Sequence, residues 1–158
     1  EETRRLFTSL GFDDVSTHGA SGNILFRAKG AASSLRRRIE EALSGKLGKP
    51  AVAILRSGEE MHGIVDAAPF KVGADVKTYV AFLAKPVGKA APPRMPCFDV
   101  RFPSPRESEV YIVAAKTTPP GTDVGKFLDR TLGKVAVTIR TWNVVQTLAE
   151  RTRAPEGR

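Results

Sequence analysis

The sequence predicts an α+β fold built from two related halves, and three observations lead to that expectation. First, segments with a helical spacing of apolar residues alternate with short apolar segments that are typical of strands. Second, residues 1–56 give the order α-β-β-α-β, and residues 76–140 give β-loop-β-β-α-β. Third, the chain has 158 residues, of which 41% are hydrophobic, so it can bury a core in one domain or in two packed halves.

Local signals define the elements of the first half. Apolar residues at helical spacing predict a first helix, and Gly11 can adopt the left-handed conformation that ends it. Small residues at 19–22 predict a hairpin turn, in which Gly22 and Asn23 suit positive φ angles. The expected elements are a helix over 2–10, strands over 14–18 and 23–28, a helix that is capped by Ser33 or Ser34 and runs to about Leu47, and a buried strand over 51–55.

The second half follows a connecting helix. Ser57 and Glu60 have the spacing of a capping box, so a helix should run from Gly58 to about Ala67. Four prolines within residues 85–96 remove backbone donors, and this segment should therefore be a loop. The strand before it alternates and should be half-buried. The remaining expected elements are strands over 76–84, 98–102, 110–115 and 135–139 and helices over 123–132 and 142–150.

The two element orders are related to a known unit. Each half becomes the β-α-β-β-α-β ferredoxin-like unit if one strand is restored before Glu1 and one helix is restored at the proline-rich loop. We interpret the chain as a degenerate duplication in which each antiparallel sheet is covered by helices on one face. The absence of an initiator methionine also suggests that residues upstream are missing. The expected domains are a first half at 1–56, a connecting helix and loop at 57–75, a second half at 76–150, and a disordered tail at 151–158.

Composition bounds the compartment and the partners. Cys97 is the single cysteine and cannot form an internal disulfide, which favours the cytoplasm. No apolar segment approaches the roughly 20 residues that cross a bilayer, so no membrane is expected. The net charge is +8, with 11 basic and 10 acidic residues at 1–75 and 14 and 7 at 76–158. Solubility is the simpler explanation of this excess, and the alternative is an anionic ligand or nucleic acid as a partner. A missing strand would leave an open edge, so we expect a monomer or an edge-paired homodimer.

Three segments carry a resemblance to a known family. They read LFTSLGFDDV at 6–15, SGNILF at 21–26 and TWNVV at 141–145. On these residues the chain resembles the bacterial domain-of-unknown-function family 1697, whose first-strand L-R-G-I-N-V-G-G motif is absent here. The chain also has GTDVGKFL at 121–128 where the family has G-I-G-R-S-K-L, and Thr141 where it has the first Asn of N-W-N. The resemblance implies tandem ferredoxin-like halves and no established activity.

The residues give little support to an enzyme. His18 and His62 lie on different expected elements, and Cys97 has no C-x-x-C partner, so neither a metal site nor a cofactor is expected. The paired carboxylates are sequence neighbours, which do not face one another on a helix or strand. Beside a strand start, Cys97 is more often a small buried hydrophobe than a nucleophile.

Two further patterns suggest anion binding, and each has a simpler explanation. Gly125 and Lys126 lie at an expected helix start whose free amides could bind phosphate, although the spacing lacks the full Walker motif and helix-start chemistry is the simpler interpretation. Tyr79 and Phe82 resemble the aromatic strand of RNA-binding modules, but their odd spacing puts them on opposite faces. Core packing for Phe82 and ordinary surface for Tyr79 are favoured.

One last group of residues forms the candidate ligand site. Arg140 and Asn143 could border a polar groove beside the turn that contains Ser21 and Asn23, since an arginine and amides suit an anion. The simpler explanations are turn geometry for Asn23, helix capping for Asn143, and packing of the last helix for Trp142. The sequence thus favours an uncharacterised non-enzymatic binding or structural protein with a basic second half. The alternatives are a nucleic-acid-binding protein and an enzyme acting on a small anionic substrate.

Overall fold

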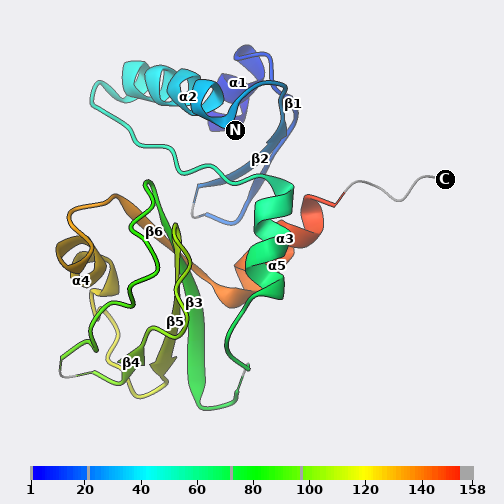
Figure 1. The fold of residues 1–158 in the computed structure, drawn as a ribbon. Helices are drawn as coiled ribbons and strands as arrows, with labels where there is room; N and C mark the ends of the chain where they lie inside the picture. Colours follow the sequence, from blue (N-terminus) through cyan, green and yellow to red (C-terminus); the bar gives the residue numbers. More distant parts are fainter. Residues whose placement is uncertain (1, 21, 72, 97, 154–158) are drawn as a thin grey trace. The chain divides into compact units, whose positions relative to one another are not determined.

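The computed structural model describes residues 2–20, 22–71, 73–96 and 98–153, and the chain divides into two compact units. Unit 1 is Glu1–Leu55, and unit 2 is Arg56–Arg158. The described residues form helices and two antiparallel sheets, which confirms the predicted α+β class (Figure 1). No helix among these residues has the length and apolar character that a membrane span needs.

Unit 1 packs two helices against a hairpin. Its elements are α1 (Glu2–Ser9), β1 (Asp13–His18), β2 (Asn23–Arg27) and α2 (Ala32–Leu47). The two strands pair antiparallel, with Ser16 opposite Leu25 and His18 opposite Asn23, as the turn signals predicted. The buried core consists of Phe7, Phe12 and Ile39, and the rings of Phe7, Phe12 and Phe26 pack on one another at centroid distances of 4.6 to 5.9 Å.

Two predictions for unit 1 are wrong. The predicted strand over 51–55 is an irregular segment, because its backbone finds partners on a helix instead of a strand: Ala51 N–H donates to Ser44 Oγ and Ala53 N–H to Glu40 Oε1. Its apolar side chains still pack against the core through Ala53 and Leu55. The predicted serine cap of α2 is also wrong. That helix begins at Ala32, before both serines, and its capping residue Ala31 makes no side-chain capping bond.

Unit 2 is a four-stranded sheet with three helices. Its elements are α3 (Gly58–Asp66), β3 (Val76–Leu83), β4 (Val100–Arg101), β5 (Glu109–Ala115), α4 (Val124–Thr131), β6 (Val137–Thr141) and α5 (Trp142–Arg151). The strand order is β4-β5-β3-β6, and every neighbouring pair is antiparallel. The proline-rich segment between β3 and β4 is a loop, as predicted. β4 is shorter than the predicted strand, and β6 begins two residues later than predicted.

Helices cover both faces of this sheet (Figure 1). The sequence predicted helices on one face only and a half-buried strand at the position of β3. On one face, Ala81, Leu83 and Ile112 pack in a cluster with Leu128 of α4. On the other face, Phe70 packs against the rings of Tyr111 and Trp142, so α3 and α5 lie there. Residues 80–83 of β3 are therefore at most 5% exposed.

The burial of β3 tests the predictions made for its two aromatic residues. Phe82 is a core residue, as predicted. Tyr79 was expected on an ordinary surface, but it is partly buried and packs against the cluster beneath α4. The sequence pattern misjudged this strand because a sheet with both faces covered shows little alternation in hydrophobicity.

Capping interactions fix the starts of the helices in unit 2. Ser57 and Glu60 form the predicted capping box at α3, with Glu60 N–H donating to Ser57 Oγ and Ser57 N–H donating to Glu60 Oε2. Asp123 caps α4. The suggested cap of α5 by Asn143 is wrong, because the capping position is Thr141 and Asn143 lies inside the first turn.

A tyrosine hydroxyl joins α3 to the sheet, and this contact can be tested. Tyr111 Oη donates to Ile64 O at 2.7 Å, and burial raises the pKa of the phenol, so the donor stays protonated. Removing the hydroxyl leaves a helix-end carbonyl buried without a donor. Tyr111→Phe should therefore lower the free energy of unfolding by about 1–3 kcal/mol in urea denaturation. Tyr79→Phe is the control and should cost less than about 0.5 kcal/mol, and equal effects would contradict the assignment.

Candidate functional site

The predicted ligand residues fall in different units. Asn23 lies in unit 1, where its Nδ2 donates to His18 O at 3.0 Å and closes the hairpin. Arg140 and Asn143 lie in unit 2, on either side of the junction between β6 and α5. Ser21 lies outside the described residues. The structure therefore brings Arg140 and Asn143 to one junction, and the four-residue site stays a prediction.

Arg140 is engaged with its own strand. Its Nη1 donates to Thr138 Oγ1 at 2.6 Å and to Ile139 O at 2.9 Å. Burial lowers the pKa of this guanidinium below its ordinary value, although an arginine with that shift stays charged at neutral pH. Asn143 is exposed one residue after the buried Trp142. The junction thus offers one partly buried cation and one exposed amide.

The predicted phosphate position at the start of α4 already holds an anion. Asp123 Oδ1 accepts from Lys126 N–H at 2.8 Å, and Lys126 Nζ lies 3.1 Å from Asp123 Oδ2. The hydrogen bond from the Lys126 backbone lowers the pKa of the Asp123 carboxyl, which keeps it ionised. A phosphate at this helix start would have to displace that carboxylate. The phosphate-binding role of Lys126 stays a prediction.

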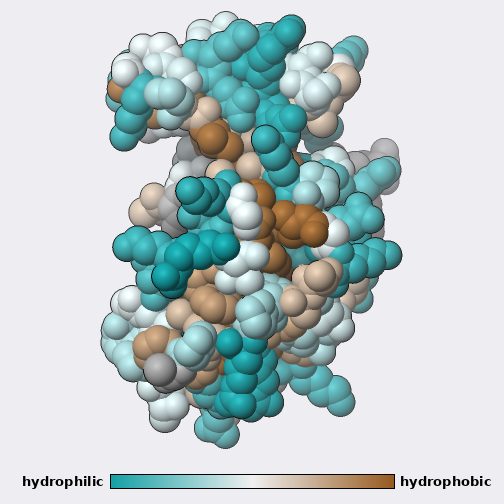
Figure 2. All heavy atoms as spheres, turned by 60° about the vertical axis from the view of Figure 1, so that its left-hand side comes forward, coloured by the Kyte–Doolittle hydropathy of each residue, from teal (hydrophilic) through white to brown (hydrophobic). Residues whose placement is uncertain are grey.

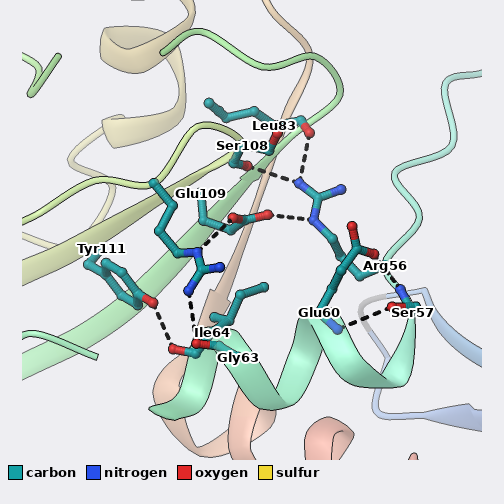
Figure 3. A network of polar contacts seen from close by, with 10 residues as sticks. Arg56, Ser57, Glu60, Gly63, Ile64, Leu83, Ser108, Glu109 and Tyr111 are labelled. Atoms are coloured by element: carbon teal, nitrogen blue, oxygen red, sulfur yellow. Dashed lines mark hydrogen bonds and ion pairs between the residues drawn. The ribbon is translucent and has the colours of Figure 1, made fainter. Parts of the chain in front are cut away.

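A network of polar contacts centres on Glu109, which is a buried carboxylate (Figure 3). Arg56 Nε donates to Glu109 Oε1 at 2.5 Å, and the exposed fractions of the two side chains are 13% and 8%. Arg56 Nη2 also donates to Leu83 O at 3.0 Å and to Ser108 O at 2.9 Å. The guanidinium carbon lies 5.7 Å from the ring centroid of Phe82. Arg56 precedes the capping residue of α3, and its contacts therefore hold the start of this helix at the ends of β3 and β5.

A second arginine completes the network. Arg106 Nε lies 3.7 Å from Glu109 Oε2, and Arg106 Nη1 donates to Gly63 O at 2.9 Å. Gly63 and Ile64 are near the end of α3, where helix carbonyls lack partners within the helix. Gly63 O already accepts from Ala67 N–H, and Arg106 adds a second donor to it, whereas Tyr111 donates to Ile64 O (Figure 3).

The chemistry of this network is structural. Both oxygens of Glu109 face a guanidinium, so the carboxylate is held as an acceptor and does not resemble a base with a free position. Arg56 and Glu109 were not among the residues predicted from the sequence, although a signal for them exists. Each charged residue adjoins an apolar segment, and a charge in such a position is seldom buried without a partner.

The histidines and carboxylates do not converge on a metal-like arrangement. His62 Nε2 lies 2.8 Å from Ala149 O, which joins α3 to α5, while His18 is in β1 of unit 1. Among residues 2–20, 22–71, 73–96 and 98–153, no group of three or more His, Cys, Asp or Glu could hold a metal ion. Cys97 lies outside the described residues.

The charge difference between the two structural units is smaller than the difference between residues 1–75 and 76–158. Unit 1 has 9 basic and 6 acidic residues, or +3, and unit 2 has 16 and 11, or +5. The contrast is smaller than +1 against +7 because α3 and the loop after it carry four acids and belong to unit 2. On the face drawn in Figure 2, hydrophilic side chains cover most of the surface, with hydrophobic side chains between them.

A basic cluster lies at the end of the unit 2 sheet where β3 begins and β5 ends. Lys77 is opposite Ala114, so Lys77 and Lys116 are diagonal neighbours on one face. Ala115 N–H donates to Asp99 O, which places Lys116 next to the turn before β4. A hollow of about 410 Å³ in this turn is lined by Arg94, Met95, Pro96, Phe98 and Asp99.

Comparison with known families agrees with the sequence motifs. A family model described as "Protein of unknown function (DUF1697)" matches residues 1–98, which is more than half of the chain. The chain belongs to this family. The match spans unit 1 and continues through β3 into the proline-rich loop of unit 2, so the resemblance found in the motifs is confirmed. No curated protein and no solved structure matches the chain.

The buried ion pair makes a sharp stability prediction. Glu109→Ala leaves the Arg56 guanidinium buried without its carboxylate, and the free energy of unfolding should fall by about 3–5 kcal/mol. The matched control is Asp99→Ala, which removes an exposed pair with Arg101 and should cost at most about 1 kcal/mol. Urea denaturation of both variants measures the difference. A loss below about 1 kcal/mol for Glu109→Ala would show that the pair is dispensable.

Proposed function

We propose that this chain is a non-enzymatic binding protein and that unit 2 binds an anionic partner at the basic end of its sheet. The observation that carries the proposal is that Arg94 lines the hollow beside Phe98, while Lys77 and Lys116 lie at the adjacent ends of β3 and β5. All three basic side chains are exposed. None of them forms an ion pair with the residues that the structure describes.

The hollow suits an anion that also has an apolar part. Arg94 offers a planar set of donors, and Lys116 offers a flexible ammonium group on the neighbouring strand end. Phe98 is partly exposed at the same place and offers an aromatic surface. Asp99 also lines the hollow, but its carboxylate is held by Arg101, with Nε at 3.3 Å. The charge at the hollow is therefore positive.

The covered sheet affects which nucleic acids could bind. RNA-binding modules of similar secondary structure stack bases on an open sheet face. Here most residues of β3 and β5 are buried, with α4 on one face and α3 and α5 on the other, so base stacking on the sheet is disfavoured. A nucleic acid would instead contact the sheet end through its phosphates, which depends strongly on salt.

The finer description of the fold is also part of the proposal. We infer that unit 2 contains a ferredoxin-like half in which the proline-rich loop replaces the first helix. In a ferredoxin-like sheet the first and third strands are central, and here β3 and β5 take those places in an all-antiparallel order. Unit 1 would then be a second such half without its first strand, consistent with its order of α1, β1, β2 and α2. The tandem domain boundaries follow from that inference.

The proposal is tested by fluorescence-anisotropy titration against labelled single- and double-stranded DNA and RNA at low and physiological salt. Lys77→Gln combined with Lys116→Gln should weaken binding. On single strands the change should reduce the slope of log affinity against log salt by about 1.4, because two phosphate contacts are lost. The matched control is Lys29→Gln combined with Lys49→Gln, which removes two exposed charges from unit 1 and should leave binding unchanged.

The other outcomes separate the remaining alternatives. An equal loss of affinity in both double variants would mean that binding depends on the overall charge of the chain and not on the basic end of the sheet. An absence of binding would turn the search to small anionic ligands, and turnover of one of them would favour the enzyme alternative. If Arg140→Ala abolished binding while the lysine variants retained it, the site would lie at the predicted residues Ser21, Asn23, Arg140 and Asn143.

A further inference from the structure

β6 is an edge strand of the unit 2 sheet. In the described chain its only strand partner is β3, on one side. Residues 137–140 are partly exposed and Thr141 is exposed, in contrast to the buried residues of β3. An exposed edge of this kind presents backbone groups that can pair with another chain.

The register shows which backbone groups of β6 point away from the sheet. Ala84 N–H donates to Ala136 O, so these two residues form a hydrogen-bonded pair. Hydrogen-bonded pairs alternate with non-bonded pairs in an antiparallel ladder, so Thr138 and Arg140 bond to β3. The N–H and C=O groups of Val137, Ile139 and Thr141 therefore point outward.

The side chain of Arg140 blocks the middle of this outward row. Its Nη1 donates to Ile139 O at 2.9 Å, which is the central outward carbonyl, and to Thr138 Oγ1 at 2.6 Å. The guanidinium is thus held along the strand by two bonds to its own neighbours. A charged side chain at an edge also disfavours pairing because it would have to lose water.

We propose that β6 is a latent dimerisation edge and that Arg140 keeps it closed against a second copy of this chain. The parity of the strand defines the register of the pairing. Two antiparallel copies of β6 would meet about Ile139, with Val137 opposite Thr141 of the other copy. Arg140 would then be opposite Thr138, so no like charges would be directly paired. The two sheets would become continuous.

This edge differs from the one predicted from the sequence, which lay beside a missing first strand of unit 1. It is also independent of the basic sheet end, because β6 borders β3 on the side away from β5 and β4. The proposal assigns Arg140 a role that its contacts explain, namely occupying the outward carbonyl of Ile139.

The proposal is tested by sedimentation velocity over a range of concentrations. Wild type should be a monomer, and Arg140→Thr should dimerise with an association constant at least about tenfold higher, because a central hydrogen bond becomes available. Arg153→Thr is the control, since it removes an arginine that is exposed and lies outside the edge, and it should behave as wild type. A folded Arg140→Thr that stays monomeric at every concentration would overturn the proposal.

A second variant ties any dimer to this edge. Ile139→Pro removes an outward N–H and leaves the bonds to β3 in place, so adding it to Arg140→Thr should abolish the dimer. A dimer that persists would lie elsewhere, which contradicts the proposal. If β6 paired with a strand of a different protein and not with a second copy of this chain, the proposal would also be contradicted.

Amide hydrogen exchange in wild type tests the open edge without any variant. The amides of Thr138 and Arg140 should exchange slowly, and those of Val137 and Ile139 rapidly. Protection of Ile139 in the monomer would mean that the edge is already covered, and the proposal would fail.

Discussion

The buried pair of Arg56 and Glu109 is the interaction on which unit 2 depends most. Both charges are removed from water, and such a pair is tolerated only when every donor and acceptor has a partner. Arg56 meets this condition by binding Leu83 O and Ser108 O as well as Glu109, and Arg106 approaches the second carboxylate oxygen. These contacts hold the start of α3 at the ends of β3 and β5. Tyr111 then holds the other end of the same helix.

The position of α3 has a consequence for binding. Once α3 and α5 cover one face of the sheet and α4 covers the other, a partner can reach this sheet only at its ends or its edges. The basic group around Lys116 lies at an end, and β6 lies at an edge. The two proposals therefore concern separate surfaces, and the same covered sheet leads to both.

Membership of an uncharacterised family gives the chain an architecture without a reaction. Its polar groups are consistent with that outcome, because among the described residues every buried polar side-chain atom except Thr118 Oγ1 has a hydrogen-bond partner. Asp123, Glu109 and His62 each have a nearby partner that explains their place. The exposed basic side chains are therefore the groups that a partner would recognise, and the proposed function depends on them.

The sequence by itself determined the features whose physics is local. The capping box of Ser57 and Glu60, the hairpin turn before Asn23 and the proline-rich loop each depend on residues only a few positions apart, and all three were predicted. The sequence motifs also indicated the family to which the chain belongs. The tertiary structure decided the features that depend on distant partners. Residues 51–55 became irregular because α2 supplies acceptors, and β3 became buried on both faces because three helices pack on it. Arg56 and Glu109 are 53 residues apart, and only the fold brings them together.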